Sequence, residues 1–91
     1  MKTTWCNEEY DCEVVDLGID NPKNEVATPL KLIKSNGERH YVVAIKQHKD
    51  IGENVLTQPN DGHVVAICVS EADAKLVASS INIASFVADM G

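Results

Sequence analysis

The chain has 91 residues, of which 44% are hydrophobic and 24% are charged, and its formal net charge is −6. A chain of this length forms one small domain around one core, and its apolar content argues against wholesale disorder. The acidic charge argues against coating nucleic acid or an anionic membrane as the primary role, because both need a positive field. We therefore expect a single domain over residues 1–91 without direct nucleic-acid binding.

The chain shows no segment that would insert into a membrane. Its longest uninterrupted apolar run is the six residues Val64–Val69, far short of the roughly 20 needed to cross a bilayer. The first nine residues contain one lysine, turn acidic and lack the apolar stretch of a signal peptide. These features predict a cytoplasmic protein without a membrane partner, in which the three cysteines stay reduced.

The first predicted strand lies in the acidic N-terminal part. Tyr10–Val14 alternates polar and apolar residues, and Val15–Ile19 continues with its apolar residues on the opposite parity. This switch predicts a bulge or bend between Val14 and Val15. Residues 20–24 then have the composition of a turn.

Two β-hairpins are predicted in the middle of the chain. Asn36-Gly37 suits a two-residue type I′ turn, which pairs Leu32 with Tyr41 and Leu30 with Val43. Alternation then places five apolar side chains on one face of this hairpin: Leu30, Leu32, Tyr41, Val43 and Ile45. Asp61-Gly62 predicts a second hairpin, in which Asn54–Gln58 pairs with His63–Val69. Because His63–Val69 is apolar on both parities, we expect that strand in the middle of the sheet.

A helix is predicted from about Glu71 to Ala88. Ser70 and Asp73 form a variant of the capping box, and acidic residues suit the first turn. Polar residues fall on the side expected to face solvent: Lys75, Ser79, Asn82, Ser85 and Asp89. Apolar residues at helical spacing form the stripe expected to pack on the sheet: Ala72, Leu76, Ile83, Ala84, Val87 and Met90, widened by Val77 and Ile81.

Together these elements predict an α+β fold. It consists of a small antiparallel sheet of four to five strands, including two hairpins, with the C-terminal helix packed on one face. One helix covers only one face of such a sheet. The other face is then left for a partner, a second copy of the chain or water.

No pattern in the sequence supplies a set of catalytic roles. It contains no phosphate loop, nucleophile elbow, His-Glu-x-x-His motif or dinucleotide fingerprint. Cys6 and Cys12 together with His40, His48 and His63 do not have the close spacing of structural zinc ligands. We therefore expect no enzyme activity, no cofactor and no bound metal.

The acidic N-terminal segment is the candidate binding surface. Its carboxylates could engage a basic surface on a protein partner, and an aromatic side chain near the terminus could anchor the contact. The alternative is a solvated edge strand, whose charge discourages association between sheets; charge runs more often have this role. The candidate partner-binding residues are Trp5, Glu8, Glu9, Asp11, Glu13, Asp16 and Asp20.

The C-terminal third resembles the ending of many short phage and prophage accessory proteins. In residues 62–79 a Gly-His-Val-Val-Ala strand runs into an alanine-rich helix. The resemblance implies a small phage protein that binds a host protein stoichiometrically, as anti-CRISPR and other anti-defence inhibitors do. We therefore expect a non-enzymatic inhibitor of a host defence complex that acts in the cytoplasm of the bacterial host. The alternatives are a self-associating domain, such as a homodimer, and a small metal- or ligand-binding protein.

Overall fold

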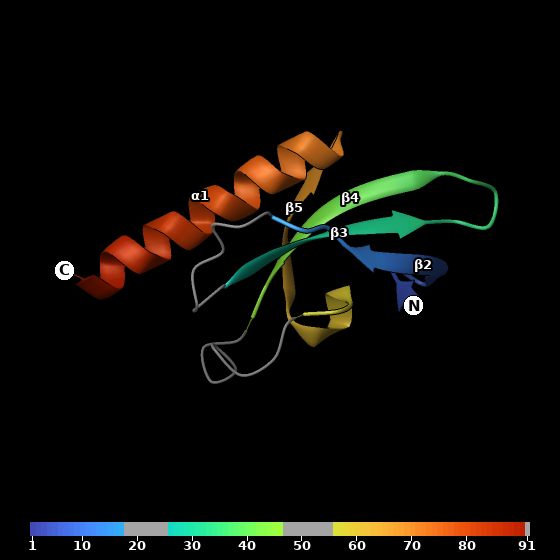
Figure 1. Ribbon diagram of the computed structural model, residues 1–91. Coiled ribbons are helices and arrows are strands. Elements are labelled where there is room, and N and C mark those ends of the chain that lie inside the picture. Colours follow the sequence, from blue (N-terminus) through green and yellow to red (C-terminus); the bar gives the residue numbers. More distant parts are fainter. Residues whose placement is uncertain (18–25, 47–55, 91) are drawn as a thin grey trace.

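The computed structural model describes residues 1–17, 26–46 and 56–90, with side chains described up to Ala84. A five-stranded antiparallel sheet and one C-terminal helix form the fold (Figure 1), which confirms the predicted α+β class. The strands follow the chain order across the sheet. The elements are β1 (Lys2–Trp5), β2 (Glu8–Val14), β3 (Ala27–Ile33), β4 (Arg39–Ile45), the 3₁₀ turn η2 (Pro59–Asp61), β5 (His63–Cys68) and α1 (Glu71–Met90).

The first two strands form a tight hairpin that the sequence did not predict. Trp5 pairs with Glu8, so that Cys6 and Asn7 make a two-residue turn. Both turn residues have positive φ, 52° for Cys6 and 63° for Asn7, as a type I′ turn requires. Asparagine tolerates this conformation, but cysteine is not a typical residue for it, so the sequence carries only half of the turn signal.

The β3–β4 hairpin was predicted at the right place but in the wrong register. Gly37 donates its N–H to the Lys34 carbonyl at 2.9 Å and has a φ of 90°. The loop is therefore the three residues Ser35, Asn36 and Gly37, in which a type I turn is followed by a left-handed glycine. Leu32 consequently pairs with His40, where the two-residue turn had predicted Tyr41.

A shift of one residue moves the side chains of β4 to the opposite faces of the sheet. Leu30 and Leu32 share their core cluster with Val42 and Ala44, whereas Tyr41, Val43 and Ile45 belong to a second cluster beneath α1. The predicted single apolar face was therefore wrong. The sheet carries a core on each face.

The β2–β3 pairing runs without a shift from Asp11↔Ile33 to Val14↔Leu30. This register excludes a bulge, one of the two alternatives that the sequence predicted between Val14 and Val15; the other was a bend. Just past the end of β2, Val15 is buried and donates its N–H to the Pro29 carbonyl at 2.9 Å. The predicted continuation to Ile19 and the turn at 20–24 extend outside the described residues.

The predicted second hairpin is absent from the described residues, because β5 pairs with β4 instead. Leu56–Gln58 is not a strand, and residues 54–55 lie outside the described part. Gly62 has an extended φ of −156°. A glycine is needed there because a Cβ would run into the Ile45 carbonyl. Among the described strands β5 has only β4 beside it, so it lies at the edge of the sheet and not in the middle as predicted.

Helix α1 packs on β3, β4 and β5, and Figure 1 shows its C-terminal part extending beyond the strands. The predicted N-cap is confirmed, since the Asp73 N–H donates to Ser70 Oγ at 3.2 Å. The predicted stripe was largely wrong, because Ala72, Leu76, Ile83 and Ala84 are exposed. The side chains of Val87 and Met90 lie outside the described part. The predicted widening residues Val77 and Ile81 are confirmed, since they pack against the cluster beneath the helix together with Ala74 and Ala78, which the sequence did not predict.

Asn82 of α1 was predicted to face solvent, but its side chain is buried between the helix and the start of β3. Its Oδ1 accepts the N–H groups of Val26 at 2.8 Å and Ala27 at 2.7 Å. Its Nδ2 donates to the Ala27 carbonyl at 3.0 Å. The side chain therefore pairs with the start of β3 much as a neighbouring strand would.

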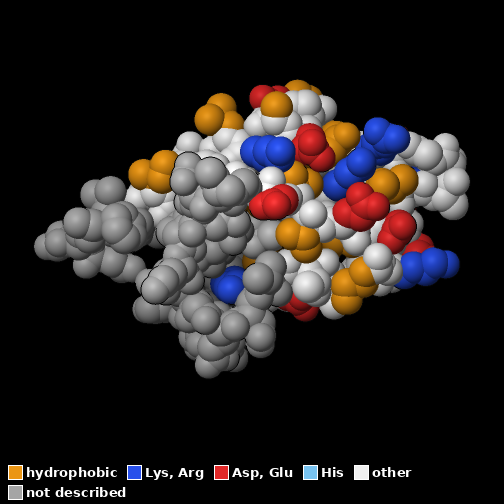
Figure 2. All heavy atoms as spheres, viewed as in Figure 1, with side chains coloured by type: hydrophobic (Ala, Val, Ile, Leu, Met, Phe, Trp, Pro, Cys, Tyr) orange, Lys and Arg blue, Asp and Glu red, His pale blue; other side chains and the backbone are white. Residues whose placement is uncertain are grey.

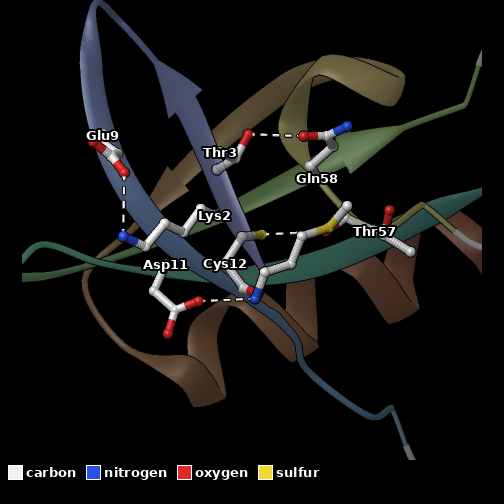
Figure 3. A network of polar contacts seen from close by, with 8 residues as sticks. Lys2, Thr3, Glu9, Asp11, Cys12, Thr57 and Gln58 are labelled. Carbon is white, nitrogen blue, oxygen red and sulfur yellow. Dashed lines mark hydrogen bonds and ion pairs between the residues drawn. The ribbon is translucent and has the colours of Figure 1, made fainter.

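The sheet face opposite α1 is partly covered by the segment that includes η2. Leu56 packs into the core there, and Thr3 Oγ1 donates to Gln58 Oε1 at 3.0 Å. Figure 3 shows this contact and the Cys12 thiol directed at the Thr57 carbonyl. The expectation that this whole face is open was therefore wrong.

Candidate protein-binding surface

Strand β2 divides its acidic side chains between the two faces of the sheet. Glu9, Asp11 and Glu13 alternate along the strand, so they share one face, and all three are exposed. This is the face that α1 uses, since Glu13 pairs with Lys31 and Lys31 with Tyr41 in the cluster beneath the helix. The helix packs on β3–β5, farther along the sheet. We call Glu9, Asp11 and Glu13 the acidic face of β2.

Two members of the acidic face contact basic groups of β1 and the N-terminus. Glu9 Oε1 lies 3.6 Å from Lys2 Nζ, and Asp11 Oδ1 accepts from the N-terminal ammonium at 2.8 Å (Figure 3). The hydrogen bond and charge of that ammonium hold the pKa of Asp11 below its usual value. Exposed ion pairs of this kind contribute little to stability, so the carboxylates stay accessible to a stronger partner.

Glu8 lies on the other face and is engaged by neighbouring side chains. Lys34 Nζ lies 2.8 Å from its carboxylate, and the Tyr10 hydroxyl donates to it at 3.0 Å. These two hydrogen bonds lower the pKa of Glu8. Lys34 also pairs with Glu38 at 3.1 Å, so this cluster joins β2 to the β3–β4 loop. Glu8 therefore has a structural role in the fold.

Trp5 packs partly into the core and does not stand free at the terminus. It lies against the cluster opposite α1, with its ring centroid 6.2 Å from that of Tyr10 and the ring planes at 56°. Its indole is half-buried. This packing fixes the end of β1 and leaves only part of the ring for a partner.

The remaining predicted residues follow the strand. Glu13 is exposed opposite Lys31. Asp16 is exposed just past β2, and Asp20 lies outside the described residues. The structure thus brings together Glu9, Asp11 and Glu13 and separates them from Glu8.

A hollow of about 350 Å³ lies beside the acidic face. Charged groups of both signs contribute to its wall, and Ile33 adds an apolar patch. Figure 2 shows the same mixture on one side of the molecule, where acidic and basic side chains intermingle over the strands. A guanidinium or ammonium group of a partner could enter this hollow and meet two carboxylates. The lining residues are Lys2, Glu9, Tyr10, Asp11, Ile33, Lys34 and Ser35.

The cysteine and histidine side chains that the structure describes are dispersed, and His48 lies outside the described residues. Cys12 is buried, and burial raises the pKa of its thiol to about 11. Cys6 is exposed in the first turn, and Cys68 lies in the cluster beneath α1. Among residues 1–17, 26–46 and 56–84, no three His, Cys, Asp or Glu side chains come together as metal ligands would.

Sequence reasoning missed a second surface, on β5. Val65 and Ile67 of β5 are exposed, as is Val69 just past its end, with 49%, 67% and 90% of their area accessible. The signal was present, since this run is apolar on both parities, but that pattern is typical of a buried central strand.

Comparison of the chain with protein-family models, with curated proteins and with solved structures gave no match. None of the helical residues that the structure describes forms a helix long and apolar enough to cross a membrane.

Proposed function

We propose that this protein is a non-enzymatic inhibitor of the phage type, which binds a host defence complex by protein–protein contact. The observation that carries the proposal is the acidic face of β2. Its three carboxylates project from one strand, Glu9 and Asp11 line a hollow, and α1 packs farther along the same sheet face on β3–β5. The resemblance of residues 62–79 to phage accessory proteins suggests the class of partner.

The geometry suits a basic protein surface better than a small molecule. Alternate residues of a strand lie roughly 7 Å apart, so three carboxylates form a line that matches a row of lysine or arginine side chains. The present neighbours of Glu9 and Asp11 are exposed groups whose ion pairs are weak. A partner arginine that forms two hydrogen bonds to one carboxylate would displace them.

The line of carboxylates also argues against mimicry of a whole phosphate backbone. Lys2, Lys31 and Arg39 lie on the same sheet face and interrupt the negative field. The acidic face therefore supports a local contact with a nuclease-effector protein or a similar complex. This contact would orient the inhibitor and raise its association rate.

The test is capture of a host complex by the purified protein, followed by binding measurements with two variants of equal charge. The variant E9Q/E13Q removes two negative charges from the acidic face. The control S80K/A84K adds two positive charges at exposed positions on α1. We expect the first variant to weaken binding at least tenfold and the control to bind within about twofold of wild type. Equal binding by both variants, or the absence of a stoichiometric host partner, would refute the proposal.

A further inference from the structure

The loop between β3 and β4 places an exposed asparagine directly before a glycine. Asn36 and Gly37 are both exposed, and Asn36 is the only one of the seven asparagines in the chain that a glycine follows. A glycine has no side chain to hinder the approach of its backbone nitrogen to another group. The nitrogen of Gly37 can therefore reach the side-chain amide of Asn36.

A hydrogen bond in the loop folds the Asn36 side chain over the following peptide. Its Oδ1 accepts the N–H of Glu38 at 2.9 Å, which closes an Asx turn. The ring that this bond closes contains both Cγ of Asn36 and the nitrogen of Gly37, so the two atoms that would react lie in one turn. The Glu38 N–H also donates to the oxygen on which negative charge develops when a nucleophile attacks Cγ, and such a donor stabilises that charge.

The nitrogen of Gly37 is held by one hydrogen bond in this exposed loop. Its N–H donates to the Lys34 carbonyl at 2.9 Å. Loops with exposed backbone hydrogen bonds open locally at little cost in free energy. Opening of this bond gives solvent base access to the Gly37 N–H without unfolding of the strands.

We propose that Asn36 is a site of spontaneous deamidation. Solvent base removes the N–H proton of Gly37, the nitrogen forms a bond to Cγ of Asn36, and Nδ2 takes up a proton and leaves as ammonia. The product is a five-membered succinimide. Water then breaks the bond from the nitrogen to Cγ, which yields aspartate, or the bond to the backbone carbonyl carbon, which yields isoaspartate. The net reaction consumes one water, releases one ammonia and adds one negative charge to the loop at neutral pH.

Asp61 also precedes a glycine, but its side chain is bound in the opposite direction along the chain. Its Oδ2 accepts the N–H of Thr57 at 3.2 Å and the Thr57 hydroxyl at 3.0 Å, both from a residue that precedes it. An ionised carboxylate is also a poorer electrophile than an amide. Residue 61 therefore keeps its ordinary peptide link to Gly62.

The first test follows the purified protein during storage at pH 8 by peptide mass spectrometry. Asn60 is the internal control, because it is exposed but precedes an aspartate. We expect Asn36 to convert at least tenfold faster than Asn60, with isoaspartate forming at residue 36 and none at residue 61. Equal rates for Asn36 and Asn60, or isoaspartate at residue 61 and not at residue 36, would overturn the proposal.

The second test separates the glycine from the turn. G37D keeps a residue type that tolerates the positive φ of 90°, but it places a side chain beside the nitrogen; it should slow conversion of Asn36 at least tenfold. Concentrated urea keeps the wild-type sequence and removes the Asx turn. We expect wild type to convert in the native state within threefold of its rate in urea, or faster. Unchanged conversion in G37D, or a native rate more than threefold below the rate in urea, would contradict the proposed reaction in the folded loop.

Discussion

At the scale of single residues, Asn82 is the side chain that joins helix to sheet. Its amide satisfies two N–H groups and one carbonyl at the start of β3, and only 2% of its area is exposed. Sequence periodicity assigned it to solvent because polar residues usually occupy the outer face of a helix. Asn82 is an exception to this rule, because its polar side chain is buried and forms hydrogen bonds to the backbone. The residues next to it in the sequence do not indicate this burial.

Replacing Asn82 with alanine should destabilise the fold by about 3 kcal/mol, because it leaves the polar backbone groups of Val26 and Ala27 buried without partners. Urea unfolding measures this loss. The control is S80A, at an exposed position on the same helix, which should change stability by less than about 0.5 kcal/mol. A loss for N82A as small as that of S80A would show that water replaces the amide.

The three cysteines should differ in reactivity. Burial raises the pKa of the Cys12 thiol to about 11, so at pH 8 only about one molecule in a thousand carries the thiolate there. Cys6 is exposed in the first turn. We expect iodoacetamide to label Cys6 first and Cys12 last in the native protein, as followed by peptide mass spectrometry. Labelling of Cys12 at the rate of Cys6 would contradict the described packing.

At the scale of elements, the sequence predicted the existence of the β3–β4 hairpin but not its register. Asn36-Gly37 suits a two-residue turn, and the same glycine also suits the left-handed position of a three-residue loop. The hydrophobic pattern could not decide between them. Leu30 and Leu32 can share a face with Val43 and Ile45 or, as observed, with Val42 and Ala44.

Helix α1 was predicted in place, but only Val77 and Ile81 of its predicted stripe pack on the sheet. Leu76 and Ile83 have larger apolar side chains than the alanines that the helix buries. Ala74 and Ala78 lie against the sheet because a small side chain lets the helix backbone approach closely. The position of β5 in the sheet was also predicted wrongly. A run of residues that is apolar on both parities occurs in central strands, but it is equally compatible with a strand at the edge.

Lys34 forms ion pairs with Glu8 of β2 and with Glu38 at the β3–β4 loop. The contribution of these pairs to the stability of the fold depends on pH. Hydrogen bonds from Lys34 lower the pKa values of Glu8 and Glu38 from 4.5, and those bonds raise the pKa of Lys34. Carboxylates with lowered pKa values stabilise the fold above pH 4.5, and this contribution is lost as the pH falls through their folded values. The contribution of Lys34 is present throughout that acidic range, since it is lost only at alkaline pH.

Stability measured by urea unfolding should therefore fall between pH 5 and pH 3 in wild type. We expect K34M to show a shallower fall and a lower stability at pH 7. K31M removes the same charge from β3 without breaking this cluster, and it should keep the wild-type slope. An unchanged slope in K34M would mean that Lys34 does not stabilise the two carboxylates.

At the scale of the whole molecule, the fold separates two different edges. The acidic face of β2 lies toward one end of the sheet, and the neutral β5 lies at the other. Salt screens both attraction and repulsion between charged proteins. Raising the salt concentration should therefore weaken the binding of a basic host partner to this chain, which carries a charge of −6. A salt titration of the complex by sedimentation velocity measures this effect, and binding that does not weaken would contradict the proposed role of the acidic face.

The proposed function is tested most directly by titrating a host nuclease-effector complex with the protein while DNA cleavage is measured. An inhibitor that acts by binding alone predicts that activity falls in proportion to added protein and reaches zero near one chain per complex, without dependence on incubation time. E9Q/E13Q should shift this titration to higher concentration, and S80K/A84K should not. Full cleavage at a large excess of protein, or progressive inactivation by a small fraction of one equivalent, would contradict the account.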